Sequence, residues 1–157
     1  MAALLIVLAL FVQTAATTNF TGSWKMVPER SGSSEQSQPI TNMLFVIDQS
    51  ADQVRLDMTS GSDKTISAVY PLGPPPRVSD EPLGAGQQRA YWQGSRLVVE
   101  RGGTISGQTV SSKQTLTLSP DGDEMTVERL VIVQHGYTLK GTPNYATVRD
   151  VFARVKP

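Results

Sequence analysis

The chain is 157 residues long, which suits a single domain, and 39% of its residues are hydrophobic, which is compatible with one core. Its fourteen basic and fourteen acidic residues cancel, so the composition gives no electrostatic footprint for nucleic acid or an anionic membrane surface. The absence of cysteine excludes disulfides, thiol catalysis and cysteine-ligated zinc or iron–sulfur clusters.

Residues 1–16 have the pattern of a signal peptide. Residues 2–12 form an unbroken apolar run, shorter than the roughly 20 residues that a helix needs to cross a bilayer. Thr14, Ala15 and Ala16 then supply the small residues of a cleavage site. We therefore expect cleavage near Ala16 and an extracytoplasmic mature domain, periplasmic or secreted, over residues 17–157, with no membrane span. An uncleaved anchor or a buried strand is the alternative.

The mature chain opens on the segment NFTGSWK, residues 19–25. Gly22 lets the backbone bend or approach another strand closely, where a Cβ would clash. The indole of Trp24 is large enough to close one end of a small barrel, and its N–H needs one partner when buried. The polar stretch that follows, residues 29–39, either crosses one end of the barrel or is partly mobile.

Short apolar runs with period two, separated by turn residues, continue from there to the end of the chain and indicate antiparallel strands. The connections between them are mostly short, which favours a meander that closes on itself and so removes its sheet edges. We predict an all-β fold, an antiparallel barrel of eight to nine strands. A barrel of this size is either filled by side chains or holds one small ligand. The predicted strands are 23–27, 43–47, 53–59, 64–70, 89–93, 96–101, 108–118, 123–134 and 145–155.

Residues 71–86 interrupt this rhythm with five prolines and three glycines. Successive prolines cannot join a ladder, and a loop of this length in a compact domain is often functional. It is either a lid over the mouth of the barrel or a solvated connection.

Arg129 lies in phase with Val127 and Val131 along one predicted strand. If that face points inward, the guanidinium can bind an anionic head group, such as a fatty-acid carboxylate, through two hydrogen bonds. In the opposite phase Leu130 and Ile132 face inward and Arg129 is solvated. The sequence leaves both open.

Several aromatic residues either line a cavity or simply fill the core, and Tyr145 is one of them. The candidate ligand-binding residues are Met58, Tyr70, Tyr91, Trp92, Arg129 and Phe152. His135 is the single histidine and lies in a predicted loop without a partner motif for catalysis or metal binding. We expect no catalytic residues, no metal and no cofactor.

The Gly-x-Trp of the first strand resembles the opening motif of lipocalin-like proteins. Two later segments, YWQGSRLVVE (91–100) and LTLSPDG (116–122), are similar to a group of exported bacterial lipocalin-like domain proteins. The resemblance implies that an arginine of the last strand packs over Trp24 to complete the closure formed with Gly22; Arg154 is the best match and Arg149 the second. The chain lacks the Thr-Asp-Tyr motif and the disulfide of secreted eukaryotic lipocalins.

Three functions follow as hypotheses. The first is an exported, monomeric, non-catalytic protein that binds a small hydrophobic or amphipathic molecule and no nucleic acid. The second is a structural or protein-interaction module of the envelope with a solid barrel. The third is an isomerase- or hydrolase-like enzyme that uses interior polar residues such as Arg129 and Tyr91.

Overall fold

The computed structural model describes residues 18–61, 64–77, 82–134 and 145–156. These residues form nine antiparallel strands in a single sheet of order β4-β3-β2-β1-β9-β8-β7-β6-β5, which confirms the predicted all-β fold. The predicted signal peptide and His135 lie outside the described residues. The strands are β1 (Gly22–Met26), β2 (Met43–Gln49), β3 (Gln53–Ser60), β4 (Lys64–Pro71), β5 (Gln88–Gln93), β6 (Arg96–Ile105), β7 (Gln108–Leu118), β8 (Glu124–Gln134) and β9 (Tyr145–Arg154).

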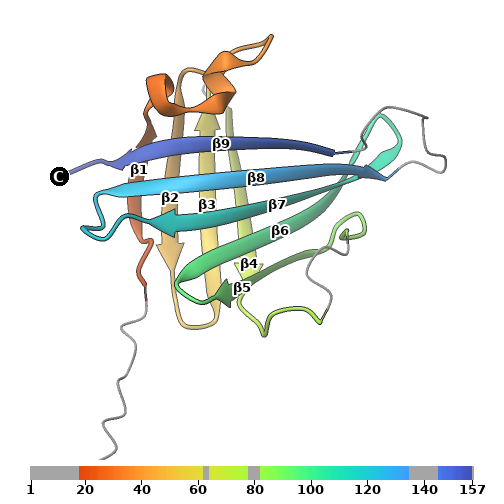
Figure 1. Cartoon of the computed structure of the whole chain (residues 1–157). Coiled ribbons are helices and arrows are strands. Elements are labelled where there is room, and N and C mark those ends of the chain that lie inside the picture. Colours follow the sequence, from red (N-terminus) through yellow and green to blue (C-terminus); the bar gives the residue numbers. More distant parts are fainter. Residues whose placement is uncertain (1–17, 62–63, 78–81, 135–144, 157) are drawn as a thin grey trace, which may run out of the picture.

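The sheet curls so that β1 to β4 cross β5 to β9 at a steep angle (Figure 1). The short strand β1 joins the two groups, because it pairs with β2 on one side and with β9 on the other. Trp24 lies opposite Arg154 in the second of these pairings. The first and last strands of the chain therefore meet in the middle of the sheet.

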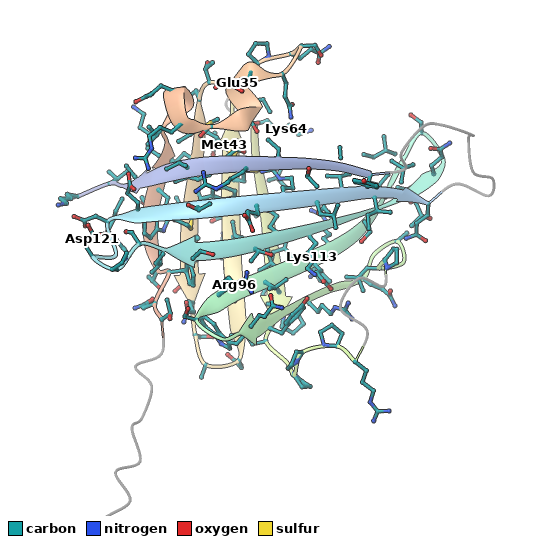
Figure 2. All side chains as sticks on the ribbon, in the orientation of Figure 1. Glu35, Met43, Lys64, Arg96, Lys113 and Asp121 are labelled. Atoms are coloured by element: carbon teal, nitrogen blue, oxygen red, sulfur yellow. The ribbon has the colours of Figure 1, made fainter. Side chains whose placement is uncertain are left out.

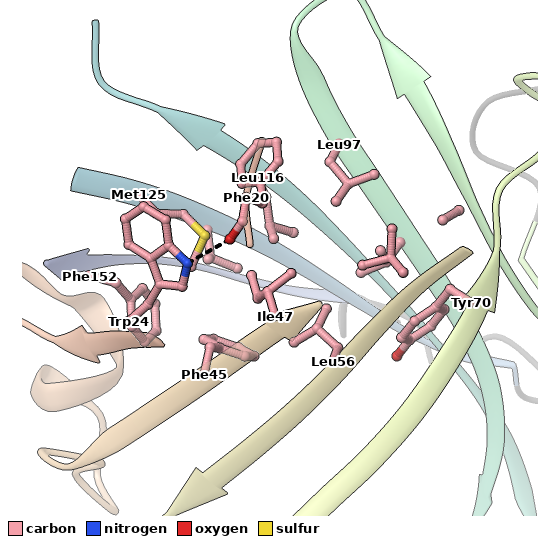
Figure 3. Packing of buried hydrophobic residues seen from close by; sticks show 14 of the residues in the cluster. Phe20, Trp24, Phe45, Ile47, Leu56, Tyr70, Leu97, Leu116, Met125 and Phe152 are labelled. Carbon is pink, nitrogen blue, oxygen red and sulfur yellow. Dashed lines mark hydrogen bonds between the residues drawn. The ribbon is translucent and has the colours of Figure 1, made fainter. Parts of the chain in front are cut away.

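The apolar core fills the end of the barrel around Trp24 (Figure 3). The rings of Phe45 and Phe152 meet edge to face, with centroids 4.9 Å apart. Leu116 and Met125 complete the packing from β7 and β8. Each such side chain, fully buried, contributes about 1.5–3 kcal/mol to stability, so this cluster holds the two groups of strands together.

Trp24 closes this end, and its Nε1 donates to the carbonyl oxygen of Phe20 at 2.9 Å. The Arg154 guanidinium lies over the indole and donates to two carbonyl oxygens, of Gly122 from Nε and of Thr21 from Nη1, each at 2.9 Å. Gly22 adopts φ +141°, where a Cβ would lie 2.8 Å from Arg154 Nη1. The missing Cβ therefore leaves room for the guanidinium.

The polar stretch after β1 contains two short 3-10 helices, η1 (Pro28–Arg30) and η2 (Gly32–Glu35), which the sequence pattern did not predict. Ser33 donates from its backbone N and its Oγ to the two carboxylate oxygens of Asp150, at 2.9 and 2.7 Å. Both side chains are buried, so this segment is tied to β9. Among the described residues no helix is long and apolar enough to span a membrane.

β4 and β5, at the two ends of the strand order, share no ladder. They meet at one parallel bridge between Leu72 and Ala90, and Gln88 Nε2 donates to the carbonyl oxygen of Val69 at 2.6 Å. The barrel is therefore nearly closed, and β4 and β5 keep sheet edges that the sequence-based expectation of full closure did not include. The connection that follows β4 contains Pro74, Pro75 and Pro76, which have no N–H to donate to a ladder.

Candidate ligand-binding cavity

A cavity of about 260 Å³ lies inside the barrel and is lined by strands of both crossing groups. Its apolar wall comes from β2, β3 and β4, where every second residue points inward. The clean alternation of β3 explains this, because Arg55 and Asp57 then face solvent. The apolar lining residues are Phe45, Leu56, Met58, Ile66 and Ala68.

The opposite wall is polar and comes from β6, β7 and β8. It carries two arginines, Arg101 and Arg129, together with Ser112 and Gln114, and Tyr70 completes the lining from β4. No carboxylate is among the described lining residues. The cavity is therefore amphipathic, and its charged groups are all cationic.

Arg129 points into the barrel, which settles the phase that the sequence left open. Its Nη2 lies 4.0 Å from the sulfur of Met43, at the start of β2 on the far wall (Figure 2). A thioether is a weak acceptor, and no carboxylate forms an ion pair with Arg129 within the described part of the chain. Burial lowers the pKa of Arg129 below its ordinary value, and the charge of Asp150 partly offsets this effect.

Gln114 lies directly opposite Arg129 in the register of β7 and β8, so the two side chains share the interior face. Its Oε1 is buried and has no hydrogen-bond partner. Tyr70 lies across the cavity and is 6% exposed. Burial raises the pKa of the Tyr70 phenol, and the nearby charge of Arg101 acts in the opposite direction. The polar wall thus holds a cationic donor with one weak acceptor and an amide oxygen without a partner, and the Tyr70 phenol faces them from β4.

The structure brings three of the predicted ligand-binding residues, Met58, Tyr70 and Arg129, around one cavity. Two others lie in the packed cluster instead. Trp92 lies against Phe20, with ring centroids 6.1 Å apart, and Phe152 packs on the aromatic core beside the cavity. A ligand role for any of these residues stays a prediction.

The expectation that Tyr91 lines the interior is wrong. Ala90 and Trp92 belong to the interior cluster, so Tyr91 between them points outward. Its hydroxyl donates to Glu100 Oε1 at 2.9 Å, and Arg89 binds the other carboxylate oxygen of Glu100. Tyr91 and Glu100 are both buried on the outer face, and this burial hides the alternation from which the strand's phase would be read.

Sequence reasoning also missed three polar lining residues, Arg101, Ser112 and Gln114. The signal for the last two was present, because both lie in phase with Leu116 on the core-side face of β7. Arg101 continues the alternation of Leu97 and Val99 in β6. Arg149, the second match to the closing arginine, lies elsewhere: its Nη2 donates to Thr126 Oγ1 at 3.4 Å.

No family model and no curated protein sequence matches this chain. Among solved structures, the chain is similar to the zebrafish ileal bile acid-binding protein complexed with cholic acid, with a TM-score of 0.46, 10% identity, and coverage of 87% of this chain and 98% of that one. For a secretory abundant heat soluble protein from Ramazzottius varieornatus, the TM-score is 0.42 at 8% identity, and the match covers 87% of this chain and 95% of that one. For the REP1-NXSQ fatty acid transporter, the TM-score is 0.43 at 10% identity, and the match covers 87% of this chain and 96% of that one.

Proposed function

We propose that this protein is an exported, non-catalytic carrier that holds one small amphipathic molecule in its barrel, with the anionic group of the ligand at Arg129. The observation that supports it best is the partner set of Arg129. Among the described residues, the one hydrogen-bond acceptor of the Arg129 guanidinium is the thioether of Met43. The apolar part of the ligand would lie against Phe45, Leu56 and Met58 on the facing wall.

The energetics favour an anion. A buried cation is costly unless it is paired, and Arg129 already shows the effect of burial in its lowered pKa. A carboxylate, sulfonate or phosphate would accept two parallel hydrogen bonds from the guanidinium, which are about twice as strong as neutral ones. Arg101 adds a second positive charge on the same wall.

The size of the cavity favours a compact ligand. About 260 Å³ lies just below the roughly 300–1,000 Å³ typical of sites for drug-sized molecules. The described lining residues offer no nucleophile paired with a base, since Ser112 has no acid–base neighbour in the lining set, and this supports binding over catalysis. The cavity likewise argues against a solid barrel.

Binding can be tested with decanoate and its uncharged counterpart decanol, by calorimetry and native mass spectrometry on the mature chain. We expect one equivalent of decanoate to bind, at least about tenfold tighter than decanol, because one charge-assisted interaction is worth about 1.4 kcal/mol or more. Arg129→Gln should remove this preference.

The matched control is Arg96→Gln, which makes the same charge change on an exposed residue at the start of β6 (Figure 2). It should keep the preference. If neither compound binds the wild type, or if both variants behave alike, the proposal fails. Export is tested separately by sequencing the amino terminus of the secreted protein, which we expect to begin at Thr17.

A further inference from the structure

The cavity opens at the seam between β4 and the sheet edge opposite it. Two of its lining residues are exposed: Ile66 on β4, at 42%, and Arg101 on β6. A residue that both lines a cavity and faces solvent marks the mouth of that cavity. Among the described residues, the seam is bridged toward the end of β4: Gln88 Nε2 donates to Val69 O, and Gly73 N donates to Ala90 O at the bridge between Leu72 and Ala90.

Described residues cover the interior at two other places. Trp24 and Arg154 seal one end of the barrel. Beyond the last residue of β1, the η2 segment lies against the interior-facing residues of β9: Ser33 binds Asp150, and Gly32 packs close to Val148. The exposed lining residues Ile66 and Arg101 therefore mark the seam as an opening to the cavity.

The seam stays open because the segment before β5, residues 82–87, is held on the outer wall of β6 and β7. Gly86 N donates to Gly102 O at 3.0 Å, and Leu83 N donates to Ser111 Oγ at 3.1 Å. Gln134 Nε2 donates to Leu83 O at 2.9 Å. A Cβ on Gly102 would overlap Gly84, lying 2.6 Å from its carbonyl carbon, so only glycine permits this close docking.

We infer that the ligand enters and leaves through this seam, and that the two interior arginines have separate roles, with Arg101 drawing the anionic group to the mouth and Arg129 holding it inside. This inference rests on the proposed function. Arg101 is exposed, so its field acts on a ligand that is still in solvent. Arg129 lies deeper, with Met43 and Gln114 as its neighbours, so its contact is made only after entry.

Stopped-flow fluorescence with the anionic amphiphile 1-anilinonaphthalene-8-sulfonate separates the two roles. Arg101→Gln should lower the association rate constant at least about threefold at low salt and weaken its dependence on salt, with dissociation changed less than about twofold. Arg129→Gln should instead raise the dissociation rate constant severalfold. Arg96→Gln, with the same loss of charge away from the cavity, should change neither.

The route itself is tested by bulk at the mouth. Ile66→Trp should slow both association and dissociation, because a larger side chain at the mouth raises the barrier on the path. Ile66 also lines the cavity, so the dissociation constant is measured separately to account for any change in affinity. Val69→Trp is the matched control, since Val69 is 41% exposed on the same strand but faces outward.

Three results would overturn the inference. If Ile66→Trp associates with the probe as fast as the wild type, the entry route is refuted. If Arg101→Gln behaves like Arg96→Gln while Arg129→Gln still releases the probe, the role of Arg101 is refuted. Either result leaves the proposed function standing. If the wild type binds neither the probe nor decanoate, the proposed function and the route fall together.

Discussion

Arg154 lies over the indole of Trp24, with its Cζ 4.1 Å from the ring centroid, so the last strand covers the plug that the first strand supplies. This is a stacked cation on an aromatic face, reinforced by two hydrogen bonds to backbone carbonyls from different segments, at Thr21 and Gly122. Three parts of the chain that are distant in sequence are fixed by one side chain.

Gly22→Ala should destabilise this closure by about 1–3 kcal/mol, because the backbone is at φ +141° and the added Cβ would displace Arg154 Nη1. Urea unfolding measures the change. Gly73→Ala is the control, since Gly73 has open space around it and should change stability by less than about 0.5 kcal/mol. In the Arg154→Ala background, the steric part of the Gly22→Ala effect should disappear; a strictly additive double variant would contradict the contact.

Gly102→Ala should release the segment that precedes β5 from the outer wall. The new Cβ would meet the backbone of Gly84 and Leu83, which cannot give way as a flexible side chain would. Hydrogen exchange should show faster exchange of the Leu83 and Gly86 amides. The neighbouring glycine offers a matched control: a Cβ at Gly103 meets nothing within 4 Å, so Gly103→Ala should leave both amides protected.

Alkaline stability should depend on Tyr70. Burial raises the pKa of its phenol above the unfolded-state value of about 10, because the interior favours the neutral form. This contribution to stability is complete below about pH 10 and is lost as the pH rises through the raised pKa. Tyr70→Phe should therefore lose less stability than the wild type between neutral and strongly alkaline pH, measured by urea unfolding.

The exposed Tyr145 supplies the comparison for that experiment. Tyr145→Phe should follow the wild-type curve against pH. A Tyr70→Phe curve that also coincides with the wild type would show that burial of the phenol has no energetic consequence.

Asp150→Asn should loosen the η2 segment. An amide offers one oxygen acceptor in place of the two carboxylate oxygens that bind Ser33 N and Oγ, so one buried donor loses its partner, at a cost of about 1–3 kcal/mol. The exchange of the Ser33 amide should accelerate. Asp123→Asn makes the same chemical change at an exposed ion pair with Lys156 and should cost about 0–1 kcal/mol.

The strand pattern was predictable because most strands have one face exposed to solvent and one face buried. In β3 the alternation of Leu56 and Met58 with Arg55 and Asp57 indicates the facing directly, and the structure agrees. The same logic failed for Tyr91, since Tyr91 and Glu100 are buried on the outer face and this removes the contrast between the two faces. The alternation of apolar and polar residues along a strand indicates which side chains are buried. Burial identifies the interior face of the barrel only where the outer face is exposed to solvent.

The candidate site was predictable in part. Arg129 was singled out from its phase with Val127, but its direction depends on how β8 is placed against β2, a long-range relation that no single strand encodes. Arg101 and Gln114 were not among the predicted site residues, although the phase of β7 places Gln114 on its core-side face. A polar residue on such a face indicates a binding site only once a cavity is known to lie there. The seam depends on the close contact between Gly102 and the backbone of Gly84. The sequence does not show this contact, because the two residues lie on different segments of the chain.

The pairing of β1 with β9 has a consequence for how the molecule is made. The hydrogen bond from Arg154 to Thr21 joins groups 133 residues apart, almost the whole described chain. Contacts of such separation form late and slowly. A polypeptide emerging from the ribosome can form its hairpins in turn, but it cannot seal the cylinder until its final strand has been synthesised.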